Sequence, residues 1–258
     1  MKKKFILILS LILLTSTSFI IVNASNVSDE KEYDWYFVPR IPGKTPEPPK
    51  ESTGFLEEFN AYYIGDPTKK ELFLTFDEGY EKGNTDDILD VLKELEIPAA
   101  FFVVKPYLDT EPDLIKRMVA EGHLVCNHSS HHPSMPSITD SEKFKKEFTD
   151  VEEAYTNITG EDMPKFFRPP MGKYSKNSLQ ETKKLGYKTI FWSFAYKDWL
   201  INSQPDEQTA IAKIKKGAHP GGILLLHAVS DTNAKILKTV LSDLKAEGYE
   251  FKSLNDLP

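Results

Sequence analysis

The sequence predicts an α/β fold, a distorted (β/α) barrel of about seven parallel strands with an N-terminal arm. From residue 70 onward, short apolar runs rich in β-branched and aromatic residues alternate with amphipathic segments of helical period. Seven such strand units within about 185 residues suit a closed or nearly closed barrel. Ionisable residues also follow five of these strands directly. An open, doubly wound sheet is the alternative architecture.

Composition and charge exclude several classes of protein. Of the 258 residues, 40% are hydrophobic and 28% are charged, which is ordinary globular composition and excludes a disordered or collagen-like chain. The net charge of −7 argues against a nucleic-acid-binding protein, which needs a basic face. The single cysteine, Cys126, cannot form an internal disulfide, and its strand position predicts a buried thiol.

Residues 1–24 are expected to be a signal peptide or a membrane anchor. Three lysines precede a charge-free stretch from Phe5 to Val22, and Val22-Asn23-Ala24 has the small residues of a cleavage site. The stretch of about 18 residues is at the lower limit for a membrane-spanning helix, so cleavage and retention both stay open. In either case the rest of the chain is exported, and it contacts the membrane only through an uncleaved N-terminal segment.

Residues 25–69 are expected to form an N-terminal arm and Pro-rich linker. Five prolines between residues 39 and 49 favour extended polyproline II structure. The aromatic residues Trp35, Tyr36 and Phe37 precede them, which indicates that the arm docks on the main domain.

Residues 70–254 then carry the alternating elements of the barrel. Pro112 suits the first turn of a helix, Thr139 and Glu142 have capping-box spacing, and Gly160 is expected to end that helix. The expected strands are 72–76, 99–104, 124–127, 166–168, 188–192, 222–226 and 249–252. The expected helices are 86–95, 112–121, 139–158, 178–185, 208–216 and 233–247.

The ionisable residues that follow the strands are expected to meet at one rim, because active sites of parallel α/β folds form at the carboxyl ends of strands. These residues are Asp77 and Glu78 after the first strand, His128, His131 and His132 after the third, Arg168 at the end of the fourth, Asp198 beyond the fifth and His227 at the end of the sixth.

Two histidines four residues apart, His128 and His132, have the spacing of a divalent-metal site, with Glu78 as the natural carboxylate ligand. A polar surface loop is the alternative, and His131 is expected to point away. Asp77 then remains to act as a general base on a bound water.

Two further pairs can set protonation states. Arg168 can hold Asp77 ionised through a charge-assisted hydrogen bond. An ordinary surface ion pair is the alternative, which the rigid Pro-Pro-x-Gly turn after Arg168 makes less favoured. Asp198 can raise the pKa of His227 and keep it protonated as a general acid, whereas a structural core histidine is the alternative.

Taken together, these residues resemble the polysaccharide deacetylase family (carbohydrate esterase family 4, the NodB-homology domain). The resemblance covers about residues 70–253 and rests on five ordered motifs, at 75–79, 128–133, 168–172, 198–199 and 224–227. It implies metal-dependent removal of acetyl groups from N-acetylated sugars, with zinc the expected metal and cobalt or manganese also compatible. The roles it implies are Asp77 as base, His227 as acid, Glu78, His128 and His132 as metal ligands, Arg168 orienting Asp77, Asp198 tuning His227, and an amide near Tyr174 stabilising the oxyanion.

Further segments, at 35–37, 61–66, 79–83 and 192–193, resemble the sporulation branch of the family. That branch contains the N-acetylmuramic acid deacetylases that lead to muramic δ-lactam in spore cortex. It implies peptidoglycan glycan strands as the substrate, coupling to an amidase that removes peptide stems, and a location in the cell wall or the forespore intermembrane space. Tyr174, Trp192 and Trp199 are candidate platforms for sugar rings.

Two alternatives stay open. One is a peptidoglycan N-acetylglucosamine or chitin-type deacetylase. The other is a glycan-binding module with a decayed site, because Glu78 stands where the family usually has aspartate.

Overall fold

The structure, a computed structural model, describes residues 31–258. The expected signal peptide or anchor, residues 1–24, lies outside the described residues. Within residues 31–258, no helix is both long enough and apolar enough to cross a membrane.

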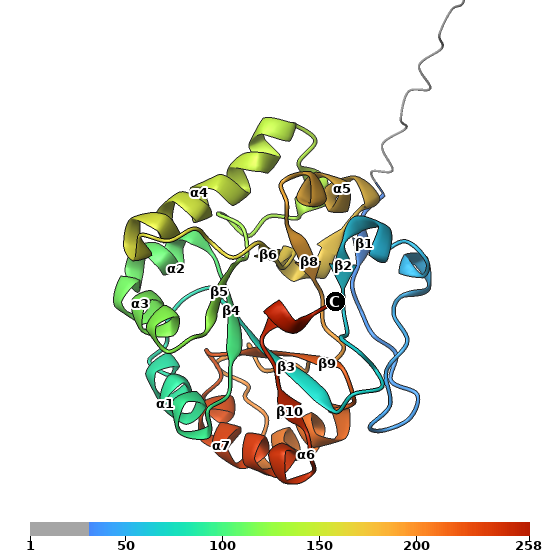
Figure 1. Cartoon of the computed structure of the whole chain (residues 1–258), viewed down its shortest axis with the longest axis vertical. Helices are drawn as coiled ribbons and strands as arrows, with labels where there is room; N and C mark the ends of the chain where they lie inside the picture. Colours follow the sequence, from blue (N-terminus) through green and yellow to red (C-terminus); the bar gives the residue numbers. More distant parts are fainter. Residues whose placement is uncertain (1–30) are drawn as a thin grey trace, which may run out of the picture.

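A curled sheet of parallel strands forms the centre of the molecule (Figure 1). Its strands run in the order β10-β3-β4-β5-β6-β8-β2, and β9 pairs with β3 as well. This arrangement confirms the predicted α/β fold with a barrel-like parallel sheet. The strand bounds are β2 (Ala61–Tyr62), β3 (Glu71–Glu78), β4 (Ala99–Val103), β5 (Leu124–Asn127), β6 (Phe166–Phe167), β8 (Lys188–Ile190), β9 (Gly222–His227) and β10 (Glu250–Phe251).

The segment after β8 nearly closes the barrel. The amides of Ser193 and Phe194 donate hydrogen bonds to the Ile223 carbonyl oxygen, at 3.0 and 3.2 Å, and the Leu225 amide donates to the Phe194 carbonyl oxygen at 2.8 Å. Because β9 pairs along β3, these bonds join the two sides of the curled sheet. The carboxyl ends of β3, β5, β6 and β9 therefore lie around one rim.

Helices cover the outside of the sheet (Figure 1). Leu72, Leu74 and Phe76 of β3 pack in the large core cluster shared with these helices, whereas Phe73 packs in a separate cluster inside the barrel. This alternation is the period of two expected of a strand that is buried on both faces. The helix bounds are α1 (Thr85–Leu95), α2 (Lys105–Thr110), α3 (Pro112–Ala120), α4 (Ser141–Thr159), α5 (Lys176–Lys184), α6 (Glu207–Gly217) and α7 (Asp231–Ala246).

Local capping differs from the expectation at α4. The helix begins at Ser141, and the Asp140 side chain accepts a hydrogen bond from the Lys143 amide at 2.9 Å. The predicted capping box from Thr139 is therefore wrong, because the aspartate one residue later supplies the cap. Gly160 ends the helix in the left-handed conformation, as predicted. Residues 31–258 also contain five short 3₁₀ turns, at Lys50–Ser52, Glu57–Phe59, Met135–Ser137, Pro170–Gly172 and Leu254–Asp256.

The N-terminal arm docks on the barrel, as its aromatic residues predicted. β1 (Tyr33–Asp34) pairs antiparallel with β7 (Lys173–Tyr174). The Trp35 ring stacks on Phe191 with a centroid distance of 4.2 Å, and its Nε1 donates to the Trp192 carbonyl oxygen at 2.9 Å. The arm also contributes β2 to the parallel sheet, which was not predicted, because a strand of two residues has no periodic pattern to detect.

Candidate active site

A cavity of about 760 Å³ opens at the rim where the strands end. It lies at the carboxyl ends of β3, β5 and β9 and is bordered by the arm and by the segment after β8. The predicted site residues that line it are Asp77, His128, His132, Trp192, Trp199 and His227.

Asp77 is held by Arg168 beneath the cavity. The Arg168 Nη1 donates to Asp77 Oδ1 at 2.6 Å, its Nη2 donates to Thr75 Oγ1 at 2.9 Å, and its Nε donates to the Ile190 carbonyl oxygen at 3.1 Å. The Arg168 side chain is fully buried, and its guanidinium lies 4.1 Å from the centroid of the Phe102 ring. Burial raises the pKa of Asp77 more than any single neighbour lowers it, but the charge and hydrogen bond of Arg168, together with the nearby His128 and His227, outweigh burial. The net pKa of Asp77 is therefore lowered, and the carboxylate stays ionised.

His227 is paired with the fully buried Asp198. The His227 Nδ1 lies 2.8 Å from Asp198 Oδ1, and the His227 amide donates to Asp198 Oδ2 at 2.9 Å. Burial lowers the pKa of His227, but the hydrogen bond and charge of Asp198, together with the charge of Asp77, outweigh it, so the net pKa is raised. The cavity therefore holds a carboxylate whose pKa is lowered and an imidazole whose pKa is raised.

His128 and His132 lie together on the same side of the cavity, with ring centroids 4.9 Å apart. Burial lowers the pKa of His128 to about 4 and also lowers the pKa of His132, so both imidazoles are neutral. The His128 Nδ1 lies 2.8 Å from the Arg168 carbonyl oxygen, which makes it the protonated nitrogen and leaves Nε2 facing Asp77 Oδ2 at 3.6 Å. A free Nε2 on a neutral imidazole is suited to a metal ion.

Glu78 does not join these histidines. Its carboxylate is buried, has no hydrogen-bond partner within the described chain, and is absent from the cavity lining. Burial raises the pKa of Glu78 well above its ordinary value, and the nearby charges of Glu81 and Asp77 raise it further. Because successive side chains of β3 alternate between the two faces, Asp77 lies inside the barrel and Glu78 on the helix-covered side.

The metal set expected from the sequence therefore does not assemble. Among residues 31–258, no three His, Cys, Asp or Glu side chains come together as a metal site. His128 and His132 fit as donors, and the expected third ligand, Glu78, is directed away from them.

Of the three aromatic residues expected to stack on sugar rings, two line the cavity and one does not. Trp192 and Trp199 line the cavity, and the Trp199 ring lies 5.4 Å from the His227 ring. Tyr174, by contrast, is fully buried against Tyr33, Trp35 and Phe191, so its expected role as a sugar platform is wrong.

Two expectations for neighbouring residues are confirmed. The His131 side chain points away from the cavity and lies 2.9 Å from Glu147. Cys126 is a buried free thiol, and burial raises its pKa.

Two supporting residues were not predicted. Thr75 accepts the third hydrogen bond of Arg168, and its position two residues before Asp77 on the same strand face was the available signal. The Asn233 Nδ2 donates to Asp198 Oδ2 at 2.6 Å and to the His227 carbonyl oxygen at 3.2 Å. It lies in the first turn of α7, where no sequence pattern distinguishes it.

Comparison with known proteins places this arrangement in a family. The family model described as polysaccharide deacetylase matches residues 64–190. The peptidoglycan-N-acetylmuramic acid deacetylase PdaA of Bacillus subtilis (strain 168) is 42% identical over 224 residues, covering 87% of this chain and 85% of that protein. The chain belongs to the polysaccharide deacetylase family. An uncharacterised 30.6 kDa protein in the fumA 3′ region of Geobacillus stearothermophilus is 46% identical over 86% of this chain and 84% of its own length.

Solved structures of polysaccharide deacetylases agree with the fold. The structure of B. subtilis PdaA, a family 4 carbohydrate esterase, superposes with a TM-score of 0.85 at 41% identity, covering 88% of this chain and 97% of that one. A family 4 carbohydrate esterase from Bacillus anthracis superposes with a TM-score of 0.74 at 40% identity, covering 89% and 97%. Polysaccharide deacetylases are hydrolases that act on amide C–N bonds and are generally metal-dependent, so the predicted enzyme class is confirmed.

Proposed function

We propose that this polysaccharide deacetylase hydrolyses the acetamide of N-acetylmuramic acid in peptidoglycan glycan strands. The observation that carries the proposal is that Asp77, whose pKa is lowered, and His227, whose pKa is raised, line the same cavity. The similarity to PdaA, which bears the name of a peptidoglycan-N-acetylmuramic acid deacetylase, supports the choice of sugar.

Asp77 acts as the general base. It removes a proton from a water molecule as the water oxygen attacks the acetyl carbonyl carbon, which forms a tetrahedral intermediate. Arg168 has no exposed surface and holds Asp77 through a 2.6 Å hydrogen bond, so the carboxylate is both oriented and kept deprotonated.

His227 acts as the general acid. It donates a proton to the sugar nitrogen as the C–N bond breaks, so that acetate and a free amino sugar leave the site. Asp198 Oδ1 accepts a hydrogen bond from the other ring nitrogen, Nδ1, at 2.8 Å, which fixes the ring orientation and stabilises the imidazolium. Exchange with solvent then removes the proton from Asp77 and returns one to His227.

Zinc is the metal that we propose from the resemblance, with cobalt or manganese as alternatives. His128 and His132 would donate to it, and such an ion would polarise the acetamide carbonyl. Glu78 has no part in this proposal, because its carboxylate lies on the other face of β3.

The surface around the cavity suits a glycan strand. Tyr80, Met171 and Trp199 line the cavity and are 51%, 52% and 47% exposed, so apolar surface is available to stack on sugar rings. We propose peptidoglycan after removal of its stems by an amidase as the substrate, and muramic δ-lactam as the fate of the product. The N-terminal segment would export the enzyme to the cell wall or the forespore intermembrane space.

Acetate release tests the proposal directly. Purified protein incubated with stem-free peptidoglycan glycan is expected to release acetate, and the same preparation carrying Asp77→Asn is expected to release almost none. Release from N-acetylglucosamine residues alone would favour the alternative deacetylase, and no release from any N-acetylated glycan would overturn the enzymatic proposal.

The pH dependence tests the assignment of His227. Because the pKa of His227 is raised, the value of kcat/KM is expected to fall only as the pH rises through that raised pKa. Asp198→Asn removes the charge that favours the imidazolium, so the pKa of His227 falls and the alkaline decline moves to lower pH. The profile is measured by initial rates of acetate release, and an unmoved alkaline limb would contradict the role of Asp198.

Glu78→Gln tests whether Glu78 is a ligand. The pKa of Glu78 is raised and its side chain faces away from the cavity, so a neutral amide of the same size is expected to keep activity within about threefold of the wild type. The zinc content of the two proteins, measured by mass spectrometry of the metal, is expected to be equal. A loss of both zinc and activity would show that Glu78 does reach the metal.

A further inference from the structure

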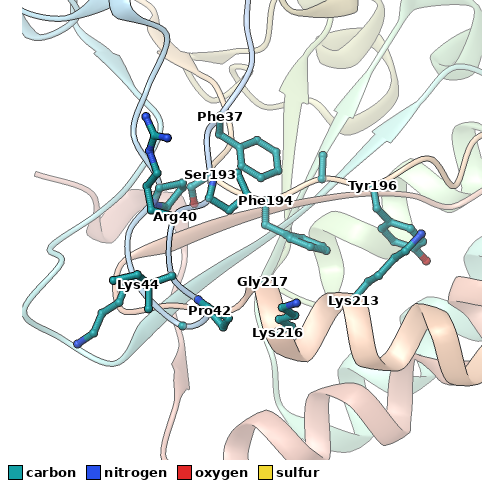
Figure 2. Close-up of a pocket in the computed structure, with 15 residues that line it drawn as sticks. Phe37, Arg40, Pro42, Lys44, Ser193, Phe194, Tyr196, Lys213, Lys216 and Gly217 are labelled. Atoms are coloured by element: carbon teal, nitrogen blue, oxygen red, sulfur yellow. The ribbon is translucent and has the colours of Figure 1, made fainter.

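A second cavity, of about 420 Å³, lies beside the catalytic one (Figure 2). Its walls are the arm segment 37–46, the residues that follow β8, and the last turns of α6. Phe37, Ala195 and Tyr196 line both cavities, so the second cavity adjoins the first. A glycan strand bound over the catalytic cavity would therefore pass next to the second one.

The second cavity combines an apolar floor with a cationic rim. Figure 2 shows Phe37 and Phe194 at its centre and Arg40 directed outward from the arm. Among the residues that the structure describes, four cationic residues and no acidic residue line this cavity, although the whole chain has a net charge of −7. The four cationic residues are Arg40, Lys44, Lys213 and Lys216.

Most of this positive charge is not neutralised by the protein. Within residues 31–258, only Arg40 has an acidic partner, Glu47, at 3.0 Å. Lys213 lies over the Tyr196 ring at 5.9 Å from its centroid, and neither Lys44 nor Lys216 forms an ion pair in the described chain. Three ammonium groups are thus available to an anionic ligand.

The cavity walls are fixed by the fold. The Val38 and Glu47 backbones exchange hydrogen bonds of 2.9 and 3.1 Å, which closes the arm segment into a loop. The Gly43 amide donates to the Lys216 carbonyl oxygen at 3.3 Å, which ties that loop to α6. At Gly217 an added Cβ would lie 2.1 Å from the Phe194 ring, so only glycine lets the helix and the ring pack this closely.

We infer that this second cavity is a subsite for a carboxylate-bearing substituent of the bound glycan strand. The inference rests on the proposed function, since it places a neighbouring part of the same substrate. The apolar floor suits a sugar ring or an alkyl group, and the lysines of the rim suit a carboxylate. The carboxylate belongs to the lactyl group of a stem-free muramic residue or to a peptide stem, which present the same chemistry.

The test compares the same glycan with and without its negative charge. Initial rates are measured on stem-free glycan, on stem-bearing glycan, and on both after methyl esterification of their carboxylates. Lys213→Glu/Lys216→Glu is expected to lower the ratio of kcat/KM for charged over esterified glycan about tenfold. If this ratio falls only for stem-free glycan, the bound group is the lactyl carboxylate. If it falls only for stem-bearing glycan, the bound group is a carboxylate of the peptide stem.

Lys143→Glu/Lys145→Glu is the matched control. It makes the same change of charge on exposed residues of α4, which Figure 1 shows on the far side of the molecule from α6. This control is expected to leave the ratio of kcat/KM for charged over esterified glycan unchanged. The same ratio in both double variants would overturn the proposed subsite.

Calorimetry separates this inference from the proposed function. If the wild type releases no acetate, the proposed function fails, and the binding of stem-free glycan still tests the subsite. A loss of affinity of about tenfold in Lys213→Glu/Lys216→Glu that disappears in high salt supports the subsite, and unchanged affinity overturns it.

Discussion

Asp77→Asn is expected to lower kcat by roughly 10²- to 10⁴-fold, the usual contribution of a positioned general base. Asparagine has the same shape as aspartate, but it cannot accept the proton of the attacking water. The carboxylate is lined up for this role because Arg168 donates to one of its oxygens at 2.6 Å, while the other faces the cavity 3.6 Å from the His128 Nε2. The rate of acetate release at saturating glycan measures the loss.

The control for this variant is Asp87→Asn, the same substitution at an exposed position of α1. It is expected to have wild-type activity. Circular dichroism of Asp77→Asn is expected to match the wild type, so that the lost rate reflects chemistry and not unfolding. A decrease in kcat of less than about tenfold in correctly folded Asp77→Asn would remove Asp77 as the base.

Arg168→Met is expected to lower the free energy of unfolding by about 3–5 kcal/mol, because it removes one partner of a buried ion pair. Methionine fills much of the space next to Phe102, but the Asp77 charge is then left without its counter-ion. The hydrogen bonds to Thr75 and to the Ile190 carbonyl oxygen are lost as well. Urea denaturation followed by circular dichroism gives the free energy.

Two comparisons isolate the charge in this result. Arg117→Met removes a partly exposed arginine that forms ion pairs with Asp86, Asp90 and Glu121. The free energy of unfolding is expected to fall by about 1 kcal/mol or less for each ion pair lost. Arg168→Met combined with Asp77→Leu removes both charges and is expected to recover most of the stability. If the double variant is no more stable than Arg168→Met, the unpaired charge is not the cause.

The sequence was informative about the site because strand ends are readable from residue type. Apolar runs ending in Asp77, Arg168 and His227 placed these side chains at the carboxyl ends of parallel strands, and β3, β6 and β9 end within one residue of them. The order of the strands around the barrel brought them together, since β9 pairs along β3 and their registers align Asp77 with His227.

Glu78 was misplaced because two neighbouring residues of one strand cannot face the same cavity. The expectation that both carboxylates reach the rim required β3 to end before Glu78, but this strand continues through it to pair with Val103. Where a strand stops depends on its partners in the sheet, which the residues of β3 alone do not specify.

Tyr174 was misplaced for a different reason. Its burial comes from the arm, because Tyr33 and Trp35 cover the ring from a segment about 140 residues earlier in the chain. Contacts of this range leave no local pattern in the sequence. The same holds for Asn233, whose bonds to Asp198 and His227 depend on how α7 follows β9.

Mass spectrometry of stem-free peptidoglycan fragments after incubation with the enzyme tests the central claim most directly. Muramic acid residues are expected to lose the mass of one acetyl-for-hydrogen exchange, while N-acetylglucosamine residues keep theirs, and Asp77→Asn is expected to leave both sugars intact. Loss of acetyl from glucosamine with muramic acid unchanged would contradict the proposed substrate, and unchanged masses in every sugar would contradict the proposed reaction.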